Sequence, residues 1–127
     1  MKVIIAGSRH CIDYGIVSKA IVASGFDRNF GISEIICGKA RGVDSIGEIY
    51  AKIFDIQVES FPADWNGPHK KAAGFIRNQA MADYAEPEVD GLIAVWDGKS
   101  TGTLDMIRRA NKRNLRVFIF NYNKEPR

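Results

Sequence analysis

The sequence predicts one Rossmann-like α/β domain with a doubly wound, mostly parallel sheet of five strands. Five short apolar runs alternate along the chain with segments of helical periodicity, as in repeated strand–helix units. Two of these runs, Val3–Ala6 and Gly91–Trp96, are apolar on consecutive residues, which is typical of strands covered by helices on both faces. The 127 residues are enough for one domain with a sizeable core, so we expect residues 1–127 to form a single unit.

The expected elements follow in chain order. The strands are Val3–Ala6, Glu34–Cys37, Ile56–Ser60, Gly91–Trp96 and Arg116–Phe120. Helical spacing between them defines the residues expected to face the sheet: Ile16, Val17, Ala20, Ile21 and Ser24; then Val43, Ile46, Gly47, Tyr50, Ala51 and Phe54; then Ala73, Ile76, Ala80 and Tyr84; and last Leu104, Ile107 and Asn111.

Residue pattern also predicts the strand order. Ile56 to Glu59 alternate between apolar and polar residues, which favours an edge position for the third strand. Right-handed crossovers then give the order 3-2-1-4-5, in which the chain reverses direction between the first and fourth strands. Ligands of such sheets bind outside the carboxyl ends of the strands at this switch point.

Composition excludes several classes of protein. The chain is 46% hydrophobic and 26% charged, as is ordinary for a soluble globular protein, and we expect a cytoplasmic protein without a membrane partner. It opens on a strand pattern rather than a signal peptide. Cys11 and Cys37 are too few for a disulfide scaffold, and His10 and His69 lack metal-ligand spacing, so no metal site is expected.

Positive charge is concentrated near the end of the chain. From Lys99 onward there are 8 Lys and Arg against 2 Asp and Glu, whereas the residues before it carry 10 against 13. Most of this excess lies on the last helix and just after it, at Arg108, Arg109, Lys112, Arg113 and Arg116. These residues form either a solvated helix face or a surface for nucleic acid. A homodimer through apolar helix faces is a third possibility.

The turn after the fourth strand predicts a phosphate site. Asp97–Thr103 supplies two glycines, a lysine and three hydroxyls before a helix, whose first N–H groups lack helical partners and carry partial positive charge. It is not a Walker A loop, because Ile93 stands where the first glycine belongs. Nor does the first turn, Gly7-Ser8-Arg9, carry the three glycines of a dinucleotide fingerprint.

Two more segments belong to the same end of the sheet. Gly38–Asp44 is a glycine-bounded turn that enters a helix, and Phe61–His69 is a long loop stiffened by prolines. Arg9 and Arg77 are candidates to clamp a phosphate, and Asp44 to hold ribose hydroxyls or to cap its helix. Asp64 and Trp65 either bind a nucleobase by hydrogen bonding and stacking or anchor their loop. Asp97 binds a ribose, a metal or its own turn amides.

Five ordered motifs resemble one family. They are Gly7-Ser8-Arg9, Cys37-Gly38-Lys39-Ala40-Arg41-Gly42-Val43-Asp44, Phe61-Pro62-Ala63-Asp64-Trp65, Gly74-Phe75-Ile76-Arg77-Asn78-Gln79-Ala80-Met81 and Trp96-Asp97-Gly98-Lys99-Ser100-Thr101-Gly102-Thr103. Together they resemble the YspA-like, cpYpsA-related branch of the SLOG superfamily, common in bacteria and their phages. The resemblance implies a Rossmann-like fold and a pocket for a nucleotide-derived ligand. The superfamily includes cytokinin-activating phosphoribohydrolases, molybdenum-cofactor-binding proteins and DNA-processing protein A.

The resemblance also bears on catalysis. Phosphoribohydrolases of the superfamily use an arginine in an Arg-x-x-x-Met helix, matched here by Arg77 and Met81, and a glutamate three residues after the threonine that Thr103 matches. That glutamate position holds Met106, and Asp105 lies one residue early, about 100° away around the helix. Arg77 and Asp105 are therefore the candidate catalytic residues of an enzyme whose activity stays open.

The expected ligand is of the ADP-ribose or nucleoside-phosphate type, and no other cofactor is expected. The residues expected to bind it are Gly7, Ser8, Arg9, Gly38, Arg41, Gly42, Asp44, Asp64, Trp65, Arg77, Asn78, Asp97, Gly98, Ser100, Thr101, Gly102 and Thr103. The alternative is a nucleic-acid-binding module that uses the basic last helix.

Overall fold

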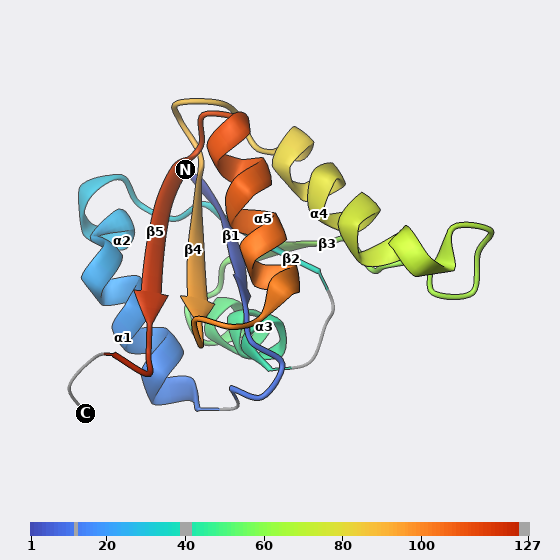
Figure 1. Cartoon of the computed structure of the whole chain (residues 1–127). Coiled ribbons are helices and arrows are strands. Elements are labelled where there is room, and N and C mark those ends of the chain that lie inside the picture. The colour runs from blue at the N-terminus through green and yellow to red at the C-terminus, as the bar shows by residue number, and fades with distance from the viewer. Residues whose placement is uncertain (12, 39–41, 125–127) are drawn as a thin grey trace.

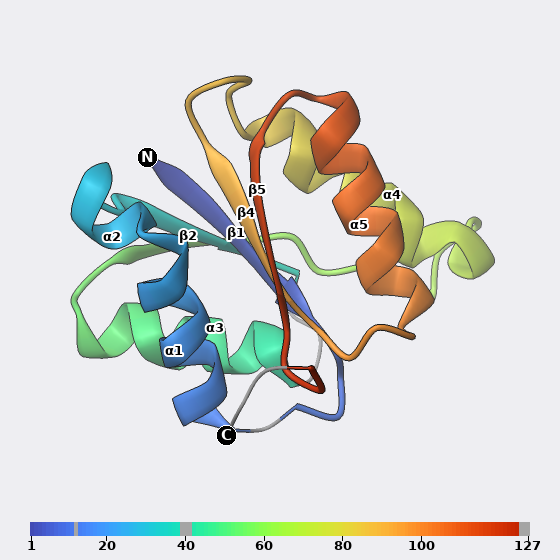
Figure 2. The same cartoon turned by 60° about the vertical axis from the view of Figure 1, so that its left-hand side comes forward.

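A computed structural model describes residues 1–11, 13–38 and 42–124, which form a parallel sheet between two layers of helices (Figures 1 and 2). The strands are β1 (Lys2–Gly7), β2 (Glu34–Cys37), β3 (Gln57–Ser60), β4 (Gly91–Trp96) and β5 (Arg116–Asn121). The helices are α1 (Tyr14–Ser24), α2 (Phe26–Asn29), α3 (Val43–Ile53), the 3-10 turn η1 (Lys70–Ala72), α4 (Ala73–Tyr84) and α5 (Thr101–Lys112). In the described ranges, no helix is long and apolar enough to cross a membrane.

The strand order is β3-β2-β1-β4-β5 with every neighbouring pair parallel, which confirms the predicted fold class and order. β3 lies at an edge, as its alternating pattern predicted. It begins at Gln57 and not at Ile56, because the Ile56 N–H donates to the Ala51 carbonyl at the end of α3 and is lost to the strand ladder. β1 pairs with β4 at the centre, with Ile5 opposite Ile93.

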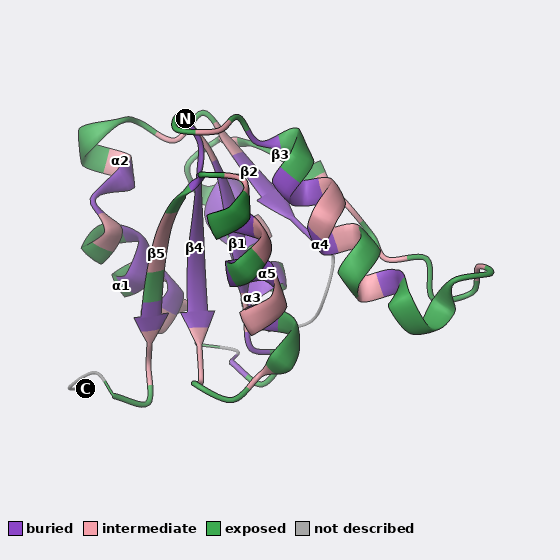
Figure 3. Ribbon diagram, turned by 45° about the horizontal axis from the view of Figure 1, so that its top comes forward, coloured by how far each residue is buried: buried purple, intermediate pink, exposed green. Residues whose placement is uncertain are grey.

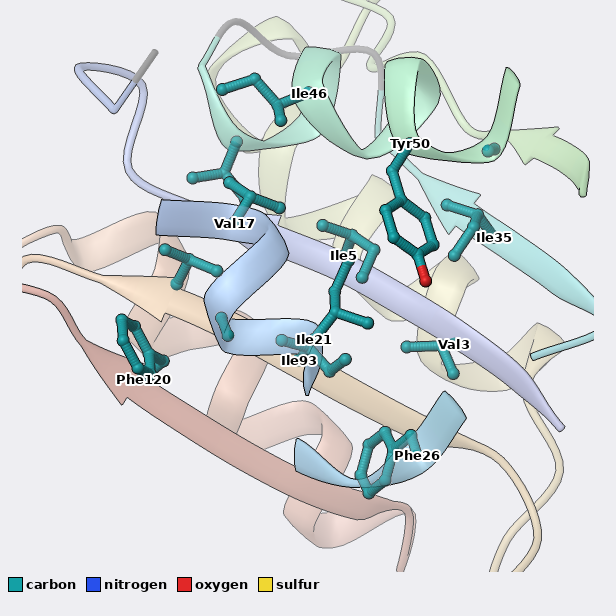
Figure 4. Packing of buried hydrophobic residues seen from close by; sticks show 14 of the residues in the cluster. Val3, Ile5, Val17, Ile21, Phe26, Ile35, Ile46, Tyr50, Ile93 and Phe120 are labelled. Carbon is teal, nitrogen blue, oxygen red and sulfur yellow. The ribbon is translucent and has the colours of Figure 1, made fainter. Parts of the chain in front are cut away.

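One face of the sheet packs against α1, α2 and α3 (Figure 2). Alternate residues of β1 point into this layer, where Val3 and Ile5 meet Val17 and Ile21 of α1 (Figure 4). The predicted inward faces of α1 and α3 are confirmed except at Phe54, which is exposed and rests on the ring of Tyr50. It lies outside the core because α3 ends at Ile53.

The opposite face packs against α4 and α5, and here the predicted helix faces are partly wrong. α4 buries Ala73, Asn78, Met81 and Ala82, whereas Ile76 and Tyr84 are exposed. The N-terminal half of α4 and its preceding loop extend past the sheet (Figures 1 and 3), so apolar spacing there has no sheet to face.

Tyr84 lies at the margin of the same layer, where its hydroxyl donates to Glu34. In α5 the buried residues are Thr103, Met106, Ile107 and Ala110. Of the residues predicted to face inward there, Ile107 is buried, Leu104 is partly buried and Asn111 is exposed. α5 therefore packs on a face rotated from the predicted one, which brings Met106 inward.

Candidate functional site

A cleft of about 490 Å³ opens at the carboxyl ends of β1 and β4, where the strand order reverses. Its walls come from the turn after β1, the first turn of α3, the loop before α4, the inner side of α4 and the start of α5. Segments that are far apart in the sequence, such as Gly7–His10 and Asp97–Thr103, therefore meet in one place.

Ser8 joins the two central turns. Its side chain is 1% exposed, its N–H donates to the Val95 carbonyl at 3.1 Å, and its Oγ accepts the Asp97 N–H at 3.1 Å. Asp97 in turn accepts the N–H groups of Lys99 and Ser100 on Oδ1, each at 2.8 Å. These backbone hydrogen bonds, led by that of Ser100, lower the pKa of Asp97, so its carboxylate is ionised and holds its own turn.

The start of α5 presents free backbone donors to the cleft. Ser100 is the N-cap, and its Oγ accepts the Thr103 N–H, while Trp96 Nε1 fixes the Ser100 carbonyl at 3.0 Å. In the part of the chain that the structure describes, the N–H groups of Thr101 and Gly102 have no hydrogen-bond partner. With the helix dipole they form a small site of partial positive charge suited to an oxyanion.

Arg77 of α4 places a guanidinium in the wall of this cleft. Its Nη1 donates to the Gly38 carbonyl at the end of β2, and its Nε donates to Asn78 Oδ1 at 3.0 Å. A Cβ at residue 38 would lie 2.4 Å from Nη1, so the arginine can hold this position only beside a glycine and would have to shift beside any other residue. Burial lowers the pKa of Arg77 from its usual value; the nearby Asp44 carboxylate opposes this shift and Arg9 adds to it.

Asp105 points away from the cleft, toward α4. Its Oδ2 accepts Asn78 Nδ2 at 3.0 Å and Arg109 Nε at 2.8 Å, and Arg109 Nη1 reaches Gln79 Oε1 at 2.9 Å. Met106, 1% exposed, lines the cleft instead. This is the position at which the resemblance to the phosphoribohydrolases led us to expect a glutamate.

The rim combines cations with an aromatic ring. The guanidinium of Arg9 lies 5.8 Å from the ring centroid of Trp65, whose side chain is 50% exposed. Lys71 and Lys99 also line the cleft, as does the buried carboxylate of Asp44 in the first turn of α3. Cations outnumber carboxylates among these lining residues, which favours an anionic guest.

Most of the residues expected to bind a ligand line this cleft. They are Gly7, Ser8, Arg9, Asp44, Trp65, Arg77, Asn78, Asp97, Ser100, Thr101, Gly102 and Thr103. Gly38 supports Arg77, and Gly98 lies in its turn with φ of 85°. Gly42 has φ of 75°, and a Cβ there would lie 2.4 Å from the Ser8 carbonyl oxygen. Arg41 lies outside the described residues.

Asp64 lines a different cavity from Trp65, although the two are adjacent in sequence. The cleft also includes residues that were not among those expected to bind the ligand, His10, Lys71, Phe75, Met81 and Lys99 among them. Lys71 lies beside one of the quoted motifs and Lys99 within another, so their positive charge could have marked them as residues that bind an anionic ligand. Among the described residues, no three His, Cys, Asp or Glu gather as a metal site would require.

Comparison with known proteins now bears on this cleft. The model of the YspA, cpYpsA-related SLOG family matches residues 1–67, which include β1, β2, α3, β3 and Trp65. The chain belongs to this SLOG family. No curated protein matches it.

One solved structure shares the fold of this SLOG protein. It is the X-ray structure of DNA processing protein A (DprA) from Streptococcus pneumoniae, with a TM-score of 0.65 and 19% sequence identity. The match covers 93% of this chain and 49% of that chain, so the SLOG protein spans about half the length of its structural relative. At this identity the likeness establishes the fold.

Proposed function

We propose that the protein is one domain that binds a nucleotide-derived ligand, of the nucleoside-phosphate or ADP-ribose type, in the cleft between β1 and β4. The observation that carries this proposal is the meeting of two anion-binding elements in one cleft. Free N–H groups of Thr101 and Gly102 and the partly buried guanidinium of Arg77 both line it. Membership of the SLOG family fits a nucleotide-related ligand.

In this proposal each part of the ligand meets a different part of the cleft. A phosphate at the start of α5 receives backbone N–H donors and the hydroxyls of Ser100 and Thr101, and Arg77 adds charge-assisted hydrogen bonds. The carboxylate of Asp44, 5% exposed in the wall, is suited to accept ribose hydroxyls. The ionised carboxylate of Asp97 accepts hydrogen bonds from its own turn, so its role is to hold the turn and not the ligand.

Ligand-dependent thermal stability tests the proposal. A matching nucleotide at a hundred times its Kd stabilises the fold by about 2.7 kcal/mol. For a domain of this size the midpoint rises by about 10 °C. We expect a rise with at least one member of a panel of nucleoside phosphates, ADP-ribose and dinucleotides. The rise should be lost in Arg77→Ala, reduced in Thr101→Val and retained in Arg108→Ala, which removes an exposed arginine. A flat response from the wild-type protein across the panel contradicts the proposal.

We further propose that this protein holds its ligand without cleaving the base from the sugar. Such cleavage develops positive charge on the ribose and needs a nearby carboxylate. At the position where the resemblance to phosphoribohydrolases expects that carboxylate, Met106 lines the cleft without one, and Asp105 is committed to Asn78 and Arg109. Asp44, the carboxylate proposed at the ribose hydroxyls, comes from α3 and is not the acid that the resemblance assigns to cleavage. Chromatography of each nucleoside monophosphate incubated with the protein should show no free base. Release of free base at enzyme-like turnover that disappears in Asp105→Asn contradicts this proposal. If release appears only in Met106→Glu, the pocket can support cleavage and the natural protein binds its ligand without cleaving it.

For the nucleic-acid alternative, α5 presents fewer cations free of protein partners than the sequence suggests. Arg109 is held by Asp105 and Gln79, and Arg113 donates to carbonyls at the end of α4, which leaves Arg108 and Lys112 exposed. Single-strand binding through those two predicts a log–log salt slope of about −1.4, and through four about −3. Titration of labelled single-stranded DNA and RNA at several salt concentrations measures the slope, and no binding at low salt excludes this alternative.

A further inference from the structure

A second cavity of about 420 Å³ lies beside the cleft, between the N-terminal half of α4 and the loop that precedes it. Its walls are mostly carbon, from Phe61, Pro62 and Pro68 of the loop and Ala73, Ile76 and Ala80 of α4. Ile76 is 52% exposed although α4 has a buried side available to apolar residues. An exposed isoleucine in a concave apolar wall favours an apolar or aromatic guest.

Arg77 lines both cavities, so the two spaces are neighbours across a single side chain. Its position is fixed by Gly38 and Asn78. A ligand whose phosphate lies at the start of α5 extends past this guanidinium to reach the second space. The hydrogen-bond donors of the cleft therefore lie on one side of Arg77, and the carbon-lined second cavity lies on the other.

The only carboxylate in the second wall is that of Asp64, and no described residue donates a hydrogen bond to it. Trp65 lies on the other side, in the cleft, where Arg9 faces its ring. A planar group in the second cavity thus meets mostly apolar walls, the carboxylate of Asp64 and the polar groups of Ser60, His69 and Arg77. An ionised carboxylate only accepts hydrogen bonds, so it favours a base edge that donates, and an exocyclic amine offers two N–H groups there.

We propose that this second cavity is the nucleobase compartment of the site and that Asp64 selects a base with an exocyclic amine, such as adenine or cytosine, over uracil. This inference rests on the proposed nucleotide function and adds the class of base. Trp65 then lies outside the base compartment, in the cleft beside Arg9.

Filling the compartment tests its occupant. Calorimetric titration measures the affinities of AMP and of ribose 5-phosphate, which lacks the base, for the wild-type protein and for Ala80→Phe. The matched control is Ala23→Phe, on the exposed side of α1. We expect Ala80→Phe to weaken AMP binding about tenfold or more and to leave ribose 5-phosphate unchanged. Ile76→Ser, at an exposed position, gives the same comparison with little risk to folding, with Val22→Ser as its control.

Base selectivity tests the role of Asp64. Wild-type protein should bind AMP and CMP about tenfold more tightly than UMP, and Asp64→Asn should remove most of that preference. Unchanged AMP affinity in both Ala80→Phe and Ile76→Ser, or UMP binding equal to CMP, overturns the base assignment while phosphate binding persists. If neither AMP nor ribose 5-phosphate binds the wild-type protein, the proposed function itself has failed.

Discussion

Gly38→Ala should weaken ligand binding without touching the ligand, because it moves Arg77. The new Cβ would lie 2.4 Å from Arg77 Nη1 and 2.9 Å from Cζ. Ordinary contact needs about 3.5 Å, so the guanidinium must shift on the order of 1 Å. We expect a tenfold to hundredfold loss of affinity, as for a lost charge-assisted hydrogen bond, because small displacements of a clamp are costly.

Stability of the free protein should change little. Gly38 lies outside the left-handed region, so alanine fits its backbone and gains about 0.4–1 kcal/mol through the unfolded chain. This offsets the loss of one hydrogen bond worth about 0.5–1.5 kcal/mol. The assay is calorimetry with AMP and ADP-ribose, together with the melting temperature of the empty protein.

A double-mutant cycle identifies the route of the effect. If Gly38→Ala acts through Arg77, it has no further effect on affinity in an Arg77→Ala background. Wild-type affinity in Gly38→Ala, or additive losses in the double variant, would refute the reasoning that this glycine serves the arginine.

Four further predictions follow from other contacts. Gly102→Ala should stabilise the empty protein by about 0.5–1 kcal/mol in urea unfolding, since the new Cβ meets no protein atom within 4 Å. The same Cβ should weaken nucleotide binding, because it occupies space at the proposed phosphate position; unchanged affinity would place the phosphate elsewhere. Arg113→Ala should cost about 1–2 kcal/mol in the same measurement, against almost nothing for Arg108→Ala, because Arg113 donates to the Ala82 and Asp83 carbonyls. Because the pKa of Asp97 is lowered in the folded state, its contribution to stability is present above about pH 4 and is lost as the pH falls below that value. The free energy of unfolding in urea should therefore fall less steeply with acidification in Asp97→Asn than in the wild-type protein, and the same pH dependence in both would contradict this. For the homodimer, which the sequence left as a third possibility, we propose the outer face of α3 as its surface, since Ile53 is exposed there. Ile53→Asp should then lower a dimer mass in light scattering to that of a monomer, and a monomeric wild-type protein excludes the dimer.

Sequence patterns predicted the sheet well because strands buried on both faces leave a continuous apolar signature. β1 and β4 carry that signature, and the alternation in β3 marked the edge. Helix faces were harder to predict in α4, because its apolar residues divide between the sheet, α5 and a cavity in which Ile76 is exposed. Spacing alone cannot show which of these partners an apolar residue meets.

For the candidate site, glycine-bounded turns at strand ends predicted which segments meet, since parallel strands bring their carboxyl ends to one edge. Chain adjacency is a poor guide at Asp64 and Trp65, which the sequence left as either a base-binding pair or loop anchors, because the fold divides them between two cavities. Their separation depends on how the loop turns before α4, and the side-chain pattern does not encode that path.

The contacts between α4 and α5 have a consequence for how the cleft meets its ligand. Asn78 bonds to the Gly102 carbonyl and Asp105 at one end, and Arg113 bonds to the last carbonyls of α4 at the other. Arg77 and the start of α5 therefore belong to one braced pair of helices. A braced pair holds its donors at a fixed spacing before any ligand arrives, so little conformational entropy is lost on binding and phosphates of the wrong span are rejected.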